Sequence, residues 1–263
     1  MCTLVERVLS VDSATRASLV SGITDQSGQC SRGERYSRRS CDADSKYALF
    51  VKWRLKYRMW LGARVRAFRR YLDDVATVGP VDPYAREFYY FGPGAGLLAP
   101  QGVIYNERYL SLGDGTLVGP QVCLTAGMSG DQEMLHAPVI DIGKRCIIGR
   151  GSHLIGHWSI TLGDDIQIGP NVYITDQNHT YDDPDAPVGW QPPHEAAVSI
   201  GSGSWLGTNV VILPGTHLGR NTTVAAGAVV RGTFPDHVVL GGVPARVLRH
   251  YAPESGWVAG PPA

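Results

Sequence analysis

Aliphatic side chains recur at every sixth position through the second half of the chain. From residue 200 the run is unbroken, and the same spacing continues upstream in shorter runs, with a slip of two residues near Ile160. The series comprises Leu112, Val118, Leu124, Ile142, Ile148, Leu154, Leu162, Ile168, Ile174, Ile200, Leu206, Ile212, Leu218, Val224 and Val230. A half-buried strand repeats every second residue and a helix every third and fourth, so neither explains a period of six.

This periodicity is typical of a β-solenoid, in which each hexapeptide forms one short side of a triangular coil. The aliphatic residue points into a stacked core, and a small residue after it permits the tight corner. Three hexapeptides close one coil, and coils stack at the strand spacing of about 4.8 Å. Each coil buries its aliphatic residues only against its neighbours, so several coils and capped ends are required. We therefore expect a mainly β fold, a left-handed parallel β-helix over residues 111–235, with an N-terminal α-helical extension.

The repeat breaks after Ile174, and the six-residue spacing starts again only at Ile200. This separation is not a multiple of six, so a loop must leave the solenoid, and we place it at 176–199. Its polar residues, its three prolines and Trp190 favour an ordered loop. Loops held on a rigid scaffold are favoured places for chemistry.

The segment 46–70 reads KYALFVKWRLKYRMWLGARVRAFRR and carries nine basic residues and no acidic one. Large apolar residues recur among them at helical spacing, which predicts a basic amphipathic helix over 46–75. Residues 1–45 are rich in Ser, Asp, Gly and Arg and are expected to be irregular. We expect a connecting arm at 76–110 and a C-terminal cap and tail at 236–263.

The balance of 24 basic and 24 acidic residues conceals this asymmetry, because residues 71–263 hold nine basic residues against eighteen acidic ones. Two partners for the basic helix follow from its charge. One is the acidic body of the same protein or of a neighbouring subunit, and the other is an anionic membrane or glycolipid. Nucleic acid is not an expected partner, because no recognition module accompanies the charge.

No apolar run approaches the length that spans a bilayer, and the first residues lack the layout of a secretory signal. The five cysteines form an odd set without C-x-x-C spacing, which argues against a disulfide framework. We expect a cytoplasmic protein, or one peripheral to the inner face of the membrane.

Several segments resemble the hexapeptide-repeat acyltransferases. These are IGSGSWLGTNVVILPGTHLG from Ile200, AAGAVV from Ala225, the Phe234-Pro235 pair, GGVPARVLR from Gly241 and ITDQNHTYDDP from Ile174. Within that family the chain is most similar to the maltose/galactoside O-acetyltransferase branch. The resemblance covers about residues 110–250. It implies left-handed β-helix homotrimers that use acyl-coenzyme A, with the donor in the groove between adjacent solenoids.

The resemblance also implies that His179 is the catalytic base and that Asn178 helps to place the acceptor. A sugar hydroxyl is a weak nucleophile, and an imidazole that accepts its proton during attack typically contributes about 10²–10⁴-fold. No Ser or Cys nucleophile motif is present, in agreement with direct transfer. We expect an O-acyltransferase that moves acetyl, or a related short acyl group such as succinyl, to a saccharide or glycan hydroxyl without a metal.

The resemblance to this family implies roles for further residues. Trp205 corresponds to a residue that borders the acceptor and coenzyme cleft, and the small residues Thr208 and Ala226 correspond to positions along the pantetheine arm. Cations expected near the coenzyme phosphates are Arg246 and Arg249, where guanidinium geometry suits bidentate contacts. Arg231-Gly232 replaces the usual Thr-Lys pair, so Arg231 joins the expected coenzyme contacts.

The acceptor side departs from the family. An Asn and an Asp upstream of the base are not reproduced, and Gly149/Arg150 and His157 stand in their places. We expect Ser152, His153 and His157 to line a differently shaped acceptor pocket. A simple galactoside is therefore not the expected acceptor.

Two other classes of function remain as alternatives. His153 and His157, with His136 and His179 nearby, invite a zinc site like that of the γ-class carbonic anhydrases, which share this solenoid. The Gly-Val-Pro-Ala-Arg motif and Trp205 favour the acyltransferase instead. The second alternative is a non-catalytic solenoid scaffold. Serine acetyltransferases are a nearer enzyme alternative, although their N-terminal helical region is much longer.

Overall fold

The computed structural model describes residues 38–260, with side chains from residue 49 onward. The expected irregular segment therefore lies outside the described residues up to residue 37, and so do residues 261–263 of the tail. The chain divides within its helix, between Leu61 and Gly62, into two units. The helix and the solenoid are accordingly described one after the other.

The helix α2 (Arg38–Val75) includes the expected basic segment and begins earlier than residue 46. Its central part is free of proline and rich in Arg, Lys, Leu and Ala, which are good helix formers. It ends at Val75, where the Thr77 hydroxyl donates to the Asp73 carbonyl over 3.0 Å and a Gly-Pro pair follows at residue 79. From residue 49 to residue 75 no side chain is buried.

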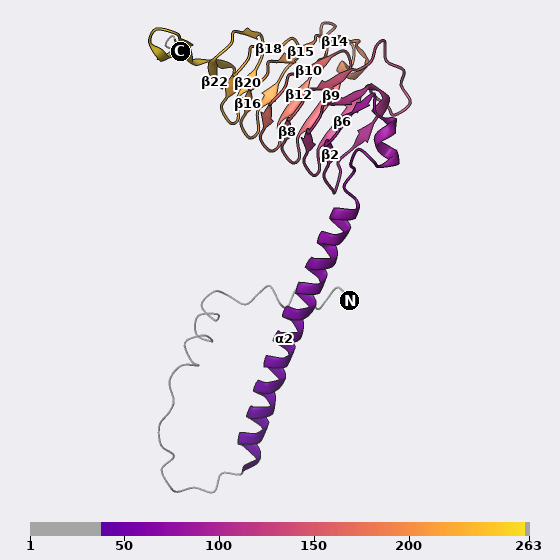
Figure 1. Ribbon diagram of the computed structural model, residues 1–263, viewed down its shortest axis with the longest axis vertical. Helices are drawn as coiled ribbons and strands as arrows, with labels where there is room; N and C mark the ends of the chain where they lie inside the picture. Colours follow the sequence, from indigo (N-terminus) through magenta and orange to yellow (C-terminus); the bar gives the residue numbers. More distant parts are fainter. Residues whose placement is uncertain (1–37, 261–263) are drawn as a thin grey trace. The chain divides into compact units, whose positions relative to one another are not determined.

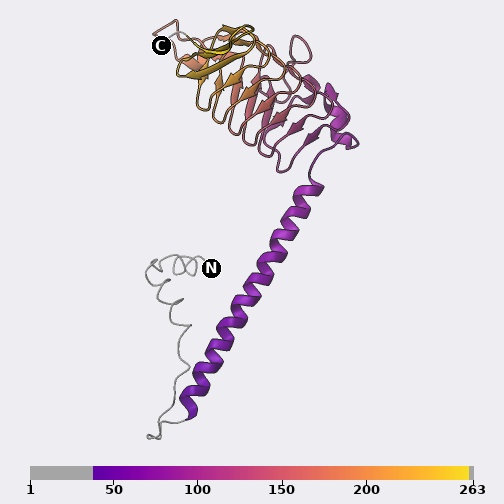
Figure 2. The ribbon, with the colours of Figure 1, turned by 60° about the vertical axis from the view of Figure 1, so that its left-hand side comes forward.

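Within the described residues, the rest of the chain forms three mainly parallel sheets that are the sides of a triangular coil, and a two-stranded hairpin. The expected left-handed parallel β-helix with an N-terminal helix is confirmed. Figure 1 shows the strands of successive coils side by side from β2 to β22, and Figure 2 shows the turns between them in line.

Each sheet forms one face of the coil. Face 1 consists of β1 (Tyr90–Phe91), β4 (Leu110–Leu112), β7 (Ile140–Ile142), β10 (Ile160–Leu162), β15 (Val198–Ile200), β18 (His217–Leu218) and β21 (Thr233–Phe234). Face 2 consists of β2 (Gly96–Leu97), β5 (Leu117–Val118), β8 (Ile147–Ile148), β11 (Gln167–Ile168), β16 (Trp205–Leu206), β19 (Thr223–Val224) and β22 (Val238–Gly242), extended by β23 (Ala245–Ala252) and β24 (Gly256–Ala259). Face 3 consists of β3 (Ile104–Tyr105), β6 (Cys123–Ala126), β9 (His153–Gly156), β12 (Tyr173–Thr175), β17 (Val211–Ile212) and β20 (Val229–Val230). The chain runs from face 1 to face 2 to face 3 and back, and we call the junctions the 1/2, 2/3 and 3/1 corners.

The periodic aliphatic residues stack on one another through the core. On face 2 the register pairs Val118 with Ile148, Ile148 with Ile168, Ile168 with Leu206, and Leu206 with Val224. Faces 1 and 3 pair their members of the series in the same way. Every member of the series is at most 4% exposed. The period of six thus marks the residues that each coil buries against its neighbours.

A series of side-chain hydrogen bonds links the corners of successive coils. Small polar residues two positions before a core aliphatic donate to carbonyls of the next coil, as Thr116 does to Gly143 (2.6 Å) and Ser204 does to Gly219 (3.3 Å). Ser152 takes part in these hydrogen bonds, because its hydroxyl donates to the Gly169 carbonyl over 3.2 Å and it is fully buried. Cys146 does the same with its thiol, and burial raises the pKa of that thiol.

The solenoid begins before the expected residue 111, because β1, β2 and β3 already form a coil that pairs in parallel with the next one. The part of the expected arm from Tyr90 onward is therefore solenoid. At the other end, β22 pairs in parallel with β19, and β23 and β24 then fold back antiparallel. These two strands extend the sheet of face 2 beyond the last coil.

The segment 127–139 leaves the solenoid between β6 and β7, and the repeat pattern does not show it. Leu124 and Ile142 lie eighteen residues apart, a multiple of six, so the phase is the same before and after the loop. The other loop does break the phase. It contains the antiparallel hairpin β13 (Gln177–His179) and β14 (Pro193–Glu195), and the short helix η3 (Val188–Trp190).

Candidate active site at the 3/1 corner

The long departures from the six-residue spacing between β6 and β15 fall at the 3/1 corner. They are the loop 127–139, the slip after β9 at 157–159, and the loop 176–197. The first two are in contact, because the rings of His136 and Trp158 meet edge to face with centroids 5.3 Å apart. The 3/1 corner of the solenoid therefore carries the irregular loops, while the core beneath it stays regular.

Asp176 anchors this corner from inside. Its side chain is fully buried, and its carboxylate accepts hydrogen bonds from the backbone amides of His157 (2.8 Å), Trp158 (2.8 Å) and Ser159 (2.6 Å). Its carbonyl accepts from the amide of Ala196 over 2.8 Å. A single residue thus holds the turn after β9 and closes the base of the loop that follows.

The loop is ordered by its own hydrogen bonds. In the hairpin, Asn178 lies opposite His194 and His179 lies opposite Pro193. The Thr180 hydroxyl donates to the Pro192 carbonyl over 2.6 Å. The Gln191 side-chain amide donates to two carbonyls of the loop and accepts from the amide of Asp183. The expectation of an ordered excursion agrees with these contacts.

His179 lies on β13, close to the base of the hairpin, and its side chain is exposed. It lines a pocket of about 280 Å³ together with Asn178, Thr180, Tyr181, Asp182, His194 and Arg231. Arg231 follows β20, so it reaches this pocket from a later coil. An exposed imidazole beside a guanidinium and an amide can accept a proton from a bound hydroxyl next to a developing negative charge.

His157 lies beneath this hairpin and not in the pocket. Its side chain is 5% exposed, and its Nδ1 lies 3.5 Å from Oε1 of Glu195 on β14. Its Nε2 is buried without a hydrogen-bond partner among the described residues. We expected His157 to contact the acceptor. In this structure its side chain lies against the hairpin, and contact with the acceptor stays a prediction. Ser152 is likewise buried and bonded, so it does not line a pocket.

The residues expected on the coenzyme side lie at other places. Thr208 and Ala226 are exposed at the 2/3 corner in successive coils, where the Gly227 amide donates to the Thr208 carbonyl over 2.9 Å. The backbones stack closely there, since a Cβ on Gly207 would lie 2.7 Å from the amide nitrogen of Ala226. Trp205 is on face 2, half exposed, between Gln167 and Thr223 of the adjacent strands.

Arg246 and Arg249 are on β23 of the cap. The Arg246 guanidinium donates to its neighbouring Ala245 carbonyl (3.0 Å), and that of Arg249 donates to the Trp257 carbonyl (3.1 Å). Both side chains are exposed. One chain thus brings Asn178, His179 and Arg231 together at the 3/1 corner, and leaves the other expected coenzyme contacts at the 2/3 corner, on face 2 and on the cap.

Sequence reasoning missed Glu195, His194 and the loop 127–139. Glu195 and His194 become neighbours of the site only through the hairpin register, which the six-residue pattern does not carry. Among the described residues, no three His, Cys, Asp or Glu side chains gather closely enough to hold a metal ion. In the same part of the chain, no helix is both long and apolar enough to cross a bilayer.

Comparisons with known proteins agree with this fold. Residues 197–232 match a family described as "Bacterial transferase hexapeptide (six repeats)", and residues 139–176 match "Hexapeptide repeat of succinyl-transferase". The solved structure of AntD, an N-acyltransferase from Bacillus cereus in complex with dTDP and 3-hydroxybutyryl-CoA, superposes with a TM-score of 0.55. That match has 18% sequence identity and covers 65% of this chain and 87% of AntD, which shows a shared fold.

Among the curated relatives that match in sequence, two illustrate the range. "Putative lipopolysaccharide biosynthesis O-acetyl transferase WbbJ" of Escherichia coli (strain K12) is 38% identical over 110 residues, which is 39% of this chain and 56% of the relative. "Putative acetyltransferase C18B11.09c" of Schizosaccharomyces pombe is 31% identical over 185 residues, which is 70% of this chain and 77% of the relative. The chain spans between 41% and 66% of the length of the first three curated relatives.

Proposed function

The chain belongs to the hexapeptide-repeat acyltransferase family, and from this premise we propose that it transfers an acyl group from acyl-coenzyme A to a hydroxyl of a saccharide or glycan. The observation that carries the proposal is the placement of His179. It stands exposed on a hairpin that is closed at its base by Asp176 and lies in one pocket with Asn178 and Arg231. The relative named for lipopolysaccharide O-acetylation supports a saccharide acceptor.

In the proposed reaction His179 is the general base. Its neutral imidazole takes the proton of the acceptor hydroxyl while that oxygen bonds to the thioester carbonyl carbon. The resulting tetrahedral intermediate then breaks its carbon–sulfur bond, and the departing thiolate takes the proton from the imidazolium. The products are an ester and free coenzyme A. Arg231 is positioned to offset negative charge in the same pocket.

The coenzyme is proposed to lie along the 2/3 corner. Thr208 and Ala226 present only small side chains there, so an extended arm can approach the backbone closely. Arg246 and Arg249 keep exposed guanidinium groups for phosphates. Acetyl-coenzyme A is the simplest donor, and a related short acyl group such as succinyl is the alternative.

A homotrimer would complete this site. His179 at the 3/1 corner and Thr208 at the 2/3 corner lie at opposite edges of face 3 in one chain. In a closed three-fold ring each chain uses one edge against the other edge of its neighbour. The base of one chain would then meet the coenzyme groove of the next.

The proposed base is tested by thiol release from a panel of acyl-coenzymes A with mono- and oligosaccharide acceptors. We expect His179→Ala to lower kcat by about 10²–10⁴-fold, as removal of a general base does. The matched control is His217→Ala on face 1, which should leave kcat within a few-fold of the parent. A folded His179→Ala variant with parental kcat would refute the assignment.

The coenzyme side is tested by Arg249→Ala, which should raise the KM for the acyl donor and leave the KM for the acceptor almost unchanged. Arg220→Ala is the control, because Arg220 is exposed and paired with Asp236 away from the proposed groove. An acceptor KM that rises more than the donor KM would contradict this placement.

The shared site is tested by mixing two inactive variants, His179→Ala and Thr208→Trp, through joint unfolding and reassembly. In a ring, a site with both halves intact needs one chain of each kind in the correct order. Random assembly therefore restores about one quarter of the parental activity. Recovery of none, from mixed trimers of the correct size, would place the whole site within one chain.

A further inference from the structure

We propose that the helix α2 binds the surface of an anionic lipid bilayer, with its aromatic side in the headgroup region. This inference does not rest on the acyl-transfer reaction. It starts from the nine cations and the absence of any acid over residues 46–70. It also starts from the exposure of the helix, since large apolar side chains such as Trp53 (62%) and Phe68 (62%) lie open to solvent.

The aromatic residues of the helix gather on one side. At 100° per residue, Phe50, Trp53, Tyr57, Trp60, Phe68 and Tyr71 fall within one sector of about 80°, and Arg64 lies among them. The other cations are spread around the helix, with Arg54 and Lys56 next to this sector and Lys52, Arg66, Arg69 and Arg70 farther round. The far side also carries exposed apolar residues, namely Val51, Leu55 and Met59.

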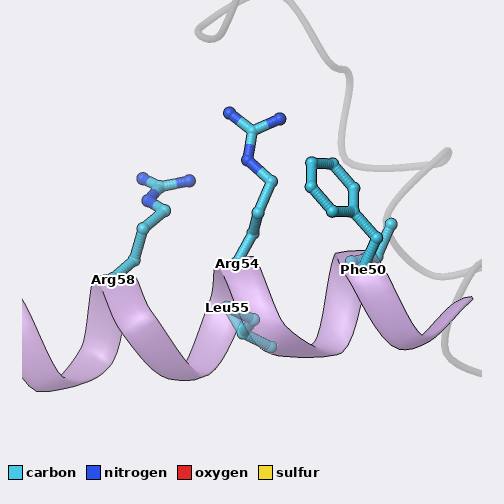
Figure 3. Close-up of a pocket in the computed structure, with 5 residues that line it drawn as sticks. Phe50, Arg54, Leu55 and Arg58 are labelled. Atoms are coloured by element: carbon cyan, nitrogen blue, oxygen red, sulfur yellow. The ribbon is translucent and has the colours of Figure 1, made fainter. Parts of the chain in front are cut away.

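Figure 3 shows this arrangement around Phe50, where Phe50, Arg54 and Arg58 project from the same side of the helix. The guanidinium carbon of Arg54 lies 5.6 Å from the centre of the Phe50 ring. The shallow hollow there is lined only by residues of this one helix, so it does not enclose a small ligand. A flat partner that meets a ring and two cations at once fits this surface better.

A bilayer surface is such a partner. Helices that lie in the membrane interface combine Lys and Arg on one side with Trp, Phe and Leu on the other. Aromatic rings settle at the level of the headgroups, while long cationic side chains extend to the phosphates. The described helix from residue 49 to residue 75 is about 40 Å long, enough to engage many headgroups.

Other occupants fit less well. A second copy of the same helix would bring nine cations against nine cations without an acid between them. Single-stranded nucleic acid needs free ring faces on which its bases stack. Here Trp53 stacks on Tyr57 (5.7 Å, 13°) and Tyr57 stacks on Trp60 (6.1 Å, 27°), so the rings cover one another.

The test is co-sedimentation of the full chain with phosphatidylcholine vesicles, with and without phosphatidylglycerol. We expect binding only to the vesicles that contain phosphatidylglycerol, and a loss of binding as salt rises. Replacing Arg54, Lys56, Arg58 and Arg69 by Gln removes four of the nine cations. Each cation near an anionic surface contributes about fivefold to partitioning, so the variant should bind about six-hundredfold more weakly than the parent.

The matched control replaces four exposed arginines of the solenoid unit, Arg86, Arg108, Arg145 and Arg220, by Gln, which changes the net charge equally. It should bind as the parent does. Equal loss in the control would overturn the proposal, because the effect would then be one of net charge. No binding of the parent to anionic vesicles would also overturn it.

Competition identifies the partner class. Single-stranded oligonucleotide that displaces the chain from anionic vesicles at matched phosphate concentration would overturn the membrane assignment in favour of nucleic acid. A second variant, Phe50→Ala with Phe68→Ala, tests the aromatic side. It should weaken binding to anionic vesicles at every salt concentration and leave the dependence of binding on salt unchanged, because no cation is removed. Far-ultraviolet circular dichroism confirms that each variant retains its helix.

Discussion

Replacing Asp176 by Asn removes the charge from the carboxylate that holds the 3/1 corner together. In the parent, one carboxylate oxygen accepts from the amide of His157, and the other accepts from the amides of Trp158 and Ser159. Asn keeps one carbonyl oxygen and turns a second group into an NH₂ donor. At least one backbone amide then faces a donor instead of an acceptor.

The expected cost follows from this count of bonds. A hydrogen bond to a charged acceptor contributes about 1.5–3 kcal/mol, and an unsatisfied buried donor carries a penalty of similar size. Trp158 and Ser159 are not fully buried, so the turn can relax and let water reach their amides. We therefore expect Asp176→Asn to lower the free energy of unfolding by about 3 kcal/mol. Asn keeps the backbone carbonyl that accepts from Ala196, but the turn held by the side chain lies next to the hairpin, so its loosening should lower kcat as well.

Urea unfolding followed by far-ultraviolet circular dichroism measures the first quantity, and thiol release measures the second. The control is Asp141→Asn on face 1, a carboxylate that is half-buried on a strand, which should change stability by less than about 0.5 kcal/mol. An Asp176→Asn variant with the parental denaturation midpoint and parental kcat would refute the role of this residue.

Two further predictions concern the stacked coils. Gly149→Ala would place a Cβ 2.5 Å from backbone atoms of the next coil, so it should destabilise the solenoid by about 1–3 kcal/mol in urea unfolding, whereas Gly79→Ala, which has no atom within 4 Å, should not. A hydrogen bond from the Tyr90 hydroxyl, and to a smaller extent the Lys144 ammonium, lowers the pKa of Asp114. Tyr90→Phe and Lys144→Met should therefore each raise that pKa towards its usual value, as measured by NMR titration. The associated stability is present above the unfolded carboxyl pKa and is lost as the pH falls through the lower folded pKa.

The core of the solenoid could be predicted from the sequence because each coil repeats the same physical requirement. Ile168 is buried because Ile148 lies on one side of it and Leu206 on the other, and the same holds along the series. The first coil was missed because its spacing is irregular: its core-facing residues Phe91, Leu97 and Ile104 are six and seven residues apart, and Leu112 follows eight residues after Ile104. Pairing with the next coil, which is a long-range contact, completes it.

The loop 127–139 could not be predicted from phase, since the eighteen residues between Leu124 and Ile142 preserve it. The loop after Ile174 was found because its length breaks the phase. A six-residue repeat reveals an inserted loop only when the number of inserted residues is not a multiple of six. A loop that adds a multiple of six residues leaves the phase unchanged and cannot be detected from it.

The candidate site, like the fold, was predicted from the sequence only in part. His179 stands in the motif that the sequence shares with its family, and the structure places it in a pocket with Arg231. Whether it is the base stays a prediction. His157 was assigned to the acceptor by counting along the chain, yet the hairpin brings Glu195 over it and buries it. That contact depends on the pairing of β13 with β14, which lies outside the six-residue repeat, so the spacing of residues along the chain does not predict it.

The hydrogen bond from the Ala196 amide to the Asp176 carbonyl has a consequence for how this fold diversifies. It joins the two ends of the hairpin, so the backbone enters and leaves the coil at almost one point. The residues between them lie outside the pairing of β12 with β17. Exchange of 178–194 between members of the family, which keeps Glu195 beside His157, should therefore transfer acceptor preference and leave the stability of the coils beneath unchanged.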